Sequence, residues 1–247
     1  MKFTAVLLSM ICLIAQTALA QVAQPSATAV NEVVIAVVLG KKLTLKDKDK
    51  LGDIVLGVLL EQFAKDNKIE PTAEELDVFI VKTAEMYKRS QVEFEEERKK
   101  LIVELKASNL SESEREGKEA QLRNIASIQS SDQETKILRK ELKKQLDTSE
   151  RQSSRSFVTR WKINKALYAK YGGRVIFQQL GAEPLDAYRD LLKEQERKGA
   201  FQILDKQYVP SFWRYFTDEA MHVFYSKDEG AKFMNTPWWM MEEPAEG

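Results

Sequence analysis

Few side chains in this sequence are suited to covalent or acid–base chemistry. The chain contains one cysteine, Cys12, and one histidine, His222. A single imidazole cannot form a histidine-rich metal site, and the sequence has no Gly-x-Ser-x-Gly element and no glycine-rich phosphate loop. His222 lies in an aromatic-rich stretch, where we expect it to be structural. The sequence therefore predicts no catalytic residue, no metal site and no cofactor.

Paired carboxylates would be another source of catalysis. The acidic residues at 95–97 and at 242–243 are adjacent in sequence. Neighbouring positions of a helix point in different directions, so these runs form no acid–base pair. An enzyme built on the aromatic C-terminal half stays open as an alternative. Its polar groups would be Tyr168, Tyr171, Arg174, Gln178, Gln179 and Tyr215.

Large and adaptable apolar side chains gather near the C-terminal end. Methionine adapts to varied partners, and tryptophan offers a large contact area. We expect binding contacts from Phe233, Met234, Trp238, Trp239, Met240 and Met241. The alternative is that this segment folds back and lines the core.

The first twenty residues have the pattern of a signal peptide. Lys2 is followed by an apolar stretch over 3–15, and Ala18 and Ala20 occupy the −3 and −1 positions of a cleavage site. We expect cleavage after Ala20 and a periplasmic or secreted protein. Cys12 would leave with the signal, so the mature chain would have no thiol and no disulfide.

Charge and hydropathy exclude several classes of partner. The chain has 38 basic and 38 acidic residues. This balance gives no electrostatic basis for binding nucleic acid or an anionic membrane. After the signal no apolar run approaches the roughly 20 residues that span a bilayer, so no membrane span is expected.

The segment that follows a short lead-in over 21–31 combines a strand with helices. The β-branched run at 33–39 ends at Gly40 and predicts a buried strand with a turn. The residues Leu43 and Thr44 either begin a return strand or cap the next element. Apolar residues at helical spacing predict a helix over 51–63. A second helix is expected after Pro71, with its apolar stripe ending near residue 87.

The stretch 91–155 is strongly charged and predicts a solvated arm of two or three slender helices. Two pairs have the spacing of helix starts, Ser111 with Glu114 and Ser131 with Glu134. An antiparallel hairpin is one arrangement of these helices. The apolar heptads are not sustained, which argues against a long coiled coil.

The composition becomes rich in aromatic residues after residue 155, and all four tryptophans lie in this part of the chain. We expect a strand at 174–181 to lie beside the 33–39 strand, with a helix as the open alternative. The other predicted elements are a helix over 161–171, a helix between Pro184 and Gly199, a short strand over 201–204, a helix from Pro210, and a helix from Thr217 that includes Met221 to Tyr225.

Residues 33–79 show a resemblance to a known protein family. The strand ending in Gly40, the helix with Leu59-Leu60-Glu61-Gln62-Phe63, and the start Pro71-Thr72-Ala73-Glu74-Glu75 resemble the N-terminal domain of SurA-type periplasmic chaperones and parvulin-type peptidyl-prolyl isomerases. That resemblance implies a helical cradle for unfolded envelope polypeptides. The stretch that would hold the parvulin catalytic domain is the charged arm, so isomerase activity is not implied.

Together these observations predict a mainly α protein, a multi-helix chaperone-like module with a long charged helical arm and a small accessory sheet. The expected segments are a signal peptide (1–20), a lead-in (21–31), a SurA-like module (32–90), the charged arm (91–155), an aromatic domain (156–241) and an acidic tail (242–247). Binding of unfolded or partly folded envelope polypeptides is the expected function, with a homodimer as a further expectation. The alternatives are a structural or adaptor subunit of an envelope complex, and the enzyme considered above.

Overall fold

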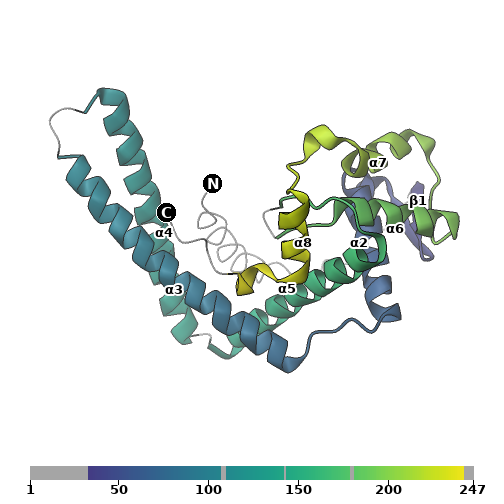
Figure 1. Cartoon of the computed structure of the whole chain (residues 1–247), viewed down its shortest axis with the longest axis horizontal. Coiled ribbons are helices and arrows are strands. Elements are labelled where there is room, and N and C mark those ends of the chain that lie inside the picture. Colours follow the sequence, from purple (N-terminus) through teal and green to yellow (C-terminus); the bar gives the residue numbers. More distant parts are fainter. Residues whose placement is uncertain (1–32, 107–109, 142, 179–180, 242–247) are drawn as a thin grey trace. The chain divides into compact units, whose positions relative to one another are not determined.

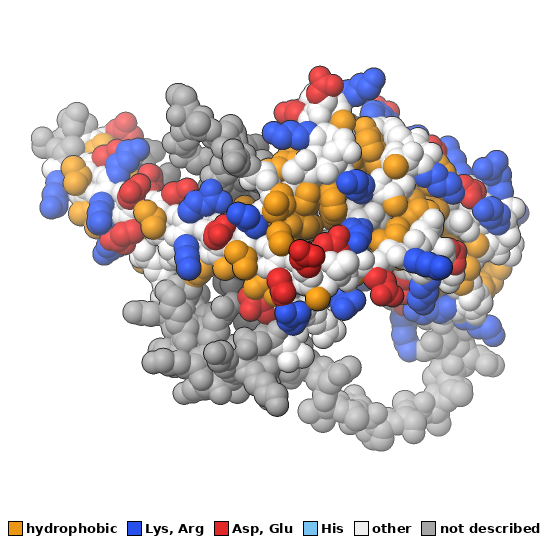
Figure 2. Space-filling view, turned by 60° about the horizontal axis from the view of Figure 1, so that its bottom comes forward, with side chains coloured by type: hydrophobic (Ala, Val, Ile, Leu, Met, Phe, Trp, Pro, Cys, Tyr) orange, Lys and Arg blue, Asp and Glu red, His pale blue; other side chains and the backbone are white. Residues whose placement is uncertain are grey.

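The computed structural model describes residues 33–106, 110–141, 143–178 and 181–241, without the side chains of 132–147. The predicted signal peptide, lead-in and acidic tail lie outside these ranges and stay predictions. Within the described ranges, no helix combines the length and apolar character needed to cross a membrane. Figure 2 shows basic and acidic side chains interspersed on the face that it presents, in keeping with the balanced composition.

The described chain is mainly α-helical with one small antiparallel sheet, which confirms the predicted fold class (Figure 1). It divides into two compact units, one made of residues 73–156 and the other of residues 33–72 together with 157–241. The first unit contains α3 (Ala73–Glu104), α4 (Glu112–Glu141) and the start of α5 (Lys143–Tyr171). The second contains β1 (Val34–Val38), β2 (Lys41–Thr44), η2 (Leu45–Lys50), α2 (Leu51–Asp66), the rest of α5, α6 (Leu185–Arg197), β3 (Phe201–Ile203), η3 (Lys206–Tyr208), α7 (Val209–Thr217), η4 (Glu219–Met221), α8 (Lys227–Asn235) and η5 (Trp238–Met240).

The sheet of the second unit has the strand order β2-β1-β3, with both pairings antiparallel. The β-branched run predicted at 33–39 forms β1, and the short run predicted at 201–204 forms β3. The expectation that 174–181 pairs with β1 is wrong. Ile176 instead forms isolated bridges with Glu183 and Phe224. Pairing partners are set by distant parts of the chain, and β2 and β3 occupy the two sides of β1.

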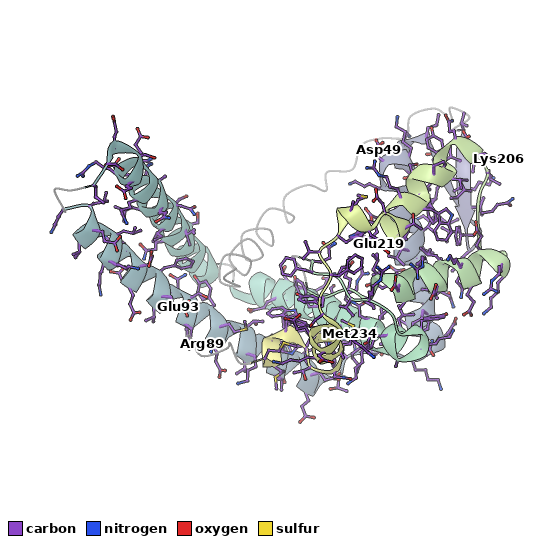
Figure 3. The ribbon with its side chains drawn as sticks, turned by 45° about the horizontal axis from the view of Figure 1, so that its top comes forward. Asp49, Arg89, Glu93, Lys206, Glu219 and Met234 are labelled. Carbon is purple, nitrogen blue, oxygen red and sulfur yellow. The ribbon has the colours of Figure 1, made fainter. Side chains whose placement is uncertain are left out.

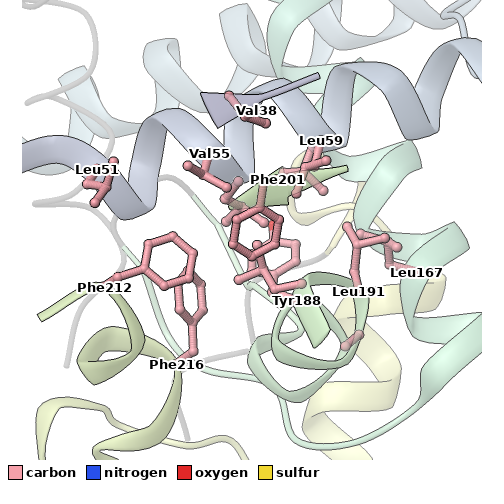
Figure 4. Packing of buried hydrophobic residues seen from close by; sticks show 14 of the residues in the cluster. Val38, Leu51, Val55, Leu59, Leu167, Tyr188, Leu191, Phe201, Phe212 and Phe216 are labelled. Atoms are coloured by element: carbon pink, nitrogen blue, oxygen red, sulfur yellow. The ribbon is translucent and has the colours of Figure 1, made fainter. Parts of the chain in front are cut away.

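The core of the second unit lies between the sheet and the helices α2, α6 and α7 (Figure 4). Val55 of α2, Tyr188 and Leu191 of α6, Phe201 of β3 and Phe212 of α7 are all buried within it. Helix α6 starts directly after Pro184, and its C-terminal end is followed by Gly199 with a φ of 72°, as the sequence predicts. The apolar stripes of these helices therefore meet around one centre.

The first unit contains an antiparallel pair of helices, α3 and α4. Lys118 forms an ion pair with Glu104, and Gln129 Nε2 donates to Glu95 Oε2 at 3.2 Å. Helix α4 begins at the predicted capping box, where the Ser111 N–H donates to Glu114 Oε2 at 2.9 Å. The second predicted start, at Ser131, is wrong because α4 continues through that residue. Helix α3 likewise continues across position 90, so one helix joins the predicted module to the predicted arm.

One carboxylate fixes the path of the chain between α5 and α6. Asp186 Oδ2 accepts hydrogen bonds from the backbone N–H of Arg174 at 2.8 Å and from its Nε at 2.9 Å. Arg189 Nη1 lies 2.9 Å from Asp186 Oδ1. A side chain at position 173 would place its Cβ 2.4 Å from the Asp186 Cβ, and Gly173 has a φ of 91°, so this close approach requires glycine.

We expect Asp186→Asn to lower the free energy of unfolding at pH 7 by roughly 2 kcal/mol, because two arginines lose a charged acceptor. For a chain of this length that corresponds to a fall of ~4–8 °C in Tm. Burial raises the pKa of Asp186, but the hydrogen bonds from Arg174 outweigh it and hold the pKa below its ordinary value. The stabilisation is therefore present above the unfolded-state pKa and is lost as pH falls through the folded-state pKa.

Thermal unfolding of both proteins between pH 7 and pH 3 measures this difference. Asp190→Asn is the matched control, since the Asp190 side chain is 43% exposed and lies 3.5 Å from Arg189 Nε; it should leave Tm nearly unchanged. An equal loss of Tm in both variants would contradict the role assigned to Asp186.

Candidate functional site

The predicted binding segment at 233–241 is largely part of the folded interior. Met234 and Trp239 are 1% and 5% exposed, so these two line the core, and only Met240 of the six predicted residues is exposed (Figure 3 labels Met234). The Trp161 ring lies 5.9 Å from the Trp239 ring in an edge-on arrangement, and its Nε1 donates to the Phe233 carbonyl at 3.2 Å. Phe233, Trp238 and Met241 are partly buried. Most of this segment therefore packs against α5 within the second unit, and a binding role for its exposed part stays a prediction.

The polar residues of the enzyme alternative do not converge on one site. Gln178 Nε2 donates to Tyr215 Oη at 3.0 Å, whereas Tyr171 bonds to Glu194 and Arg174 pairs with Asp186 and Glu219. Tyr168 is partly buried, and no hydrogen bond links its side chain to these groups among the described residues. Gln179 lies outside the described residues.

Glu183, a partly buried acid that the sequence did not single out, completes the Gln178–Tyr215 pair. Tyr215 Oη donates to Glu183 Oε2 at 3.3 Å, and His222 Nε2 lies 2.6 Å from the Tyr215 carbonyl oxygen. Burial raises the pKa of Glu183 and that of Tyr215. Each of these polar groups has a protein partner, which is the arrangement of an internal structural network. Among the described residues, no group of three or more His, Cys, Asp or Glu is placed to hold a metal ion.

An open groove lies instead at the edge of the sheet. It has a volume of about 670 Å³ and is formed by the end of α6, strand β3, turn η3 and the start of α7. Figure 3 labels Lys206, which lies in η3. The lining residues are Glu196, Gly199, Phe201, Gln202, Ile203, Lys206, Val209 and Pro210.

The backbone of β3 has an unpaired side that belongs to this groove. Among the described strands β3 pairs with β1 alone, since it is the last strand in the order β2-β1-β3. The Leu39 N–H donates to the Ala200 carbonyl at 2.7 Å, and the Leu204 N–H donates to the Ile35 carbonyl at 2.8 Å. Alternation along an antiparallel ladder then directs the N–H and C=O groups of Phe201 and Ile203 away from β1. These groups offer positions for hydrogen bonds to an added strand.

The side chains of the groove combine an apolar base with a polar rim. Phe201 is buried and Ile203 is partly buried, while Gln202 is exposed. Glu196 and Lys206, of opposite charge, are exposed and have no ion-pair partner in the described part of the chain. An extended polypeptide could pair its backbone with β3 here and place alternate side chains on the apolar base.

The sequence predicted the strand at 201–204 but not its position at the edge. That position depends on the pairing of β1 with a segment more than 160 residues away. A local sequence pattern cannot predict such a pairing. Comparisons of the chain with protein-family models, with curated proteins and with solved structures found no match.

The network around Glu183 gives a prediction about stability and pH. Because burial raises the pKa of Glu183 in the folded protein, ionisation of this group opposes folding. The cost is absent below the unfolded-state pKa, near 4.3 for glutamate, and grows as pH rises toward the folded-state pKa. Glu183→Gln removes the ionisation and keeps an acceptor for Tyr215. Its Tm should therefore exceed that of the unmodified protein at pH 7, and the difference should vanish below about pH 4.

Glu229→Gln provides a control of opposite sign. Hydrogen bonds from Ser226 lower the pKa of Glu229, so its ionised form supports folding at pH 7. Thermal unfolding across pH 4–8 should show Glu183→Gln above and Glu229→Gln below the unmodified protein. A lower Tm for Glu183→Gln at pH 7 would show that the charge of Glu183 supports the fold.

Proposed function

We propose that this protein is a chaperone-like envelope protein that binds unfolded or partly folded polypeptides and has no isomerase activity. The observation that supports this best is the unpaired edge of β3 beside the open groove. Binding would occur by strand addition, in which an extended segment of the client becomes a fourth strand next to β3.

Strand addition suits a client that is defined by its lack of structure. The backbone N–H and C=O groups of a folded protein are almost all paired, whereas an unfolded chain presents them freely. Hydrogen bonds between main chains are nearly independent of sequence, so one edge can accept many clients. The mixture of apolar base and exposed charges in the groove imposes little further selectivity.

The short strand also fits reversible binding. β3 has three residues, and Phe201 and Ile203 are the two whose N–H and C=O groups face the open edge. Each backbone hydrogen bond contributes about 1 kcal/mol net, so an affinity in the micromolar range or weaker is expected. Weak binding lets a holding chaperone release its client. The predicted signal peptide and the resemblance of residues 33–79 to SurA-type chaperones support an envelope location for this activity.

Ile203→Pro tests the proposal directly. Proline removes the outward N–H of residue 203 but leaves the β1-facing groups of Gln202 and Leu204 in place, a position that edge strands tolerate. We expect the variant to bind a fluorescent unfolded peptide about 5- to 10-fold more weakly in an anisotropy titration, because one hydrogen bond is lost. It should also slow precipitation of an unfolded outer-membrane barrel less than the unmodified protein does.

Ile203→Val is the matched control, since it keeps the N–H and a β-branched side chain. Circular dichroism and thermal unfolding should confirm that both variants are folded. If the unmodified protein at several-fold excess fails to slow precipitation, the chaperone proposal is refuted. If it succeeds and both variants match it, clients bind at a place other than the β3 edge.

A further inference from the structure

Helix α3 carries apolar side chains on two opposite faces. Its buried residues Leu76, Phe79, Ser90 and Leu101 share one face of the helix. Its exposed valines share another: Val78, Val81, Val92 and Val103 are 39%, 54%, 60% and 67% exposed. At 3.6 residues per turn these four valines fall within an arc of about 60°, on the side opposite the buried residues. An apolar stripe that faces solvent along a helix is a feature of helices that pack against a partner.

The C-terminal part of this stripe has a row of side chains whose charges exchange places when the row is read from the other end. Val92, Glu96, Lys99 and Val103 are spaced by 4, 3 and 4 residues, which places them in one row, and all four are exposed. Glu96 and Lys99 have no ion-pair partner among the described residues. The row therefore consists of an apolar residue, an acid, a base and an apolar residue.

This pattern is complementary to itself in the antiparallel direction. Around the midpoint between Glu97 and Arg98, three acidic residues at 95–97 precede three basic residues at 98–100. A second helix laid antiparallel across this midpoint places its Val103 against Val92 and its Lys99 against Glu96. The two-fold axis repeats both contacts. Each valine of one row therefore meets a valine of the other, and each charge meets its opposite.

We propose that a second copy of this chain docks on the α3 stripe, forming an antiparallel, two-fold symmetric helix pair centred between Glu97 and Arg98. Such a contact is isologous, with the same patch used by both copies. Figure 3 labels Arg89 and Glu93, which lie on α3 beside Val92. Beyond the stripe, Arg89 of one copy would approach Lys106 of the other, and these like charges limit the contact at each end.

The size of the contact predicts a weak dimer. The row from Val92 to Val103 extends over about 17 Å of helix. A single row of side chains of this length covers less area than the ~800 Å² per partner of a standard stable interface. Association should therefore depend on protein concentration, and the fraction of protein in the dimer should rise between about 10 µM and about 500 µM.

Charge exchange provides the test, with sedimentation velocity and light scattering as measurements. Glu96→Lys places lysine against lysine at both contacts, and Lys99→Glu places glutamate against glutamate. Each single variant should be monomeric at concentrations where the unmodified protein dimerises. The double variant E96K/K99E reverses both partners and should restore the dimer. Since all four positions are exposed, none of these changes should alter Tm appreciably.

Glu97→Lys is the control, because residue 97 is exposed but lies on a different side of the helix from the stripe; it should dimerise like the unmodified protein. A monomer throughout the concentration range, or single variants that still dimerise, would overturn the proposal. The same single variants should retain binding of unfolded peptide, and Ile203→Pro should still dimerise. Failure of the dimer and failure of the chaperone function are thereby distinguished.

Discussion

The pairing of β1 with β3 is the interaction on which the second unit depends. β1 precedes residue 40 and β3 follows residue 200, so their hydrogen bonds join the two segments of the chain that make up this unit. Closing so long a loop is entropically costly, although the cost grows only slowly with length. A few hydrogen bonds do not offset it. Burial of Phe201 of β3 against Phe212 of α7, with ring centroids 5.5 Å apart, illustrates the apolar contacts that do.

The same pairing creates the candidate binding site. A strand that enters the sheet from a distant segment becomes an edge unless another strand covers it, and Gly199 turns the chain directly from α6 into β3. Proteins usually shorten or charge such edges to avoid aggregation. β3 has only three residues, and the exposed Glu196 and Lys206 line its groove. These features limit how much chain can add to the edge, which suits transient capture of one segment better than growth of an extended sheet.

Local patterns in the sequence predicted many of the elements. The run at 33–39, the stripe of α2, the proline before α6 and the capping box at Ser111 all specify structure through neighbours a few residues away. Where the outcome depended on distant residues, prediction failed. The pattern at 174–181 suggested a strand, but Asp186 and the bridges of Ile176 determine its path.

A further difference concerns the stretch that follows residue 217. A helix was expected from Thr217 through Tyr225, yet that stretch forms η4 and an extended bridge, and α8 begins only at Lys227. The capping box of Ser226 with Glu229 was a local signal that marked this start and was missed. For the Met and Trp residues at 233–241 the sequence left two possibilities, binding contacts or core lining, and composition alone could not show that Met234 and Trp239 would be buried.

The two surfaces proposed for binding would recognise their partners by different physics. The β3 edge offers backbone groups, which any extended chain can pair with, so its selectivity is for conformation. The α3 stripe offers an ordered row of side chains, in which each charge needs its opposite at a fixed spacing, so its selectivity is for one partner. A weak dimer of such molecules would present two edges to one client. When two weak sites engage the same chain, the second binds at a raised effective concentration, and the overall affinity exceeds that of either site. Concentration-dependent pairing through α3 would thus strengthen the hold on long unfolded clients without any change in the groove itself.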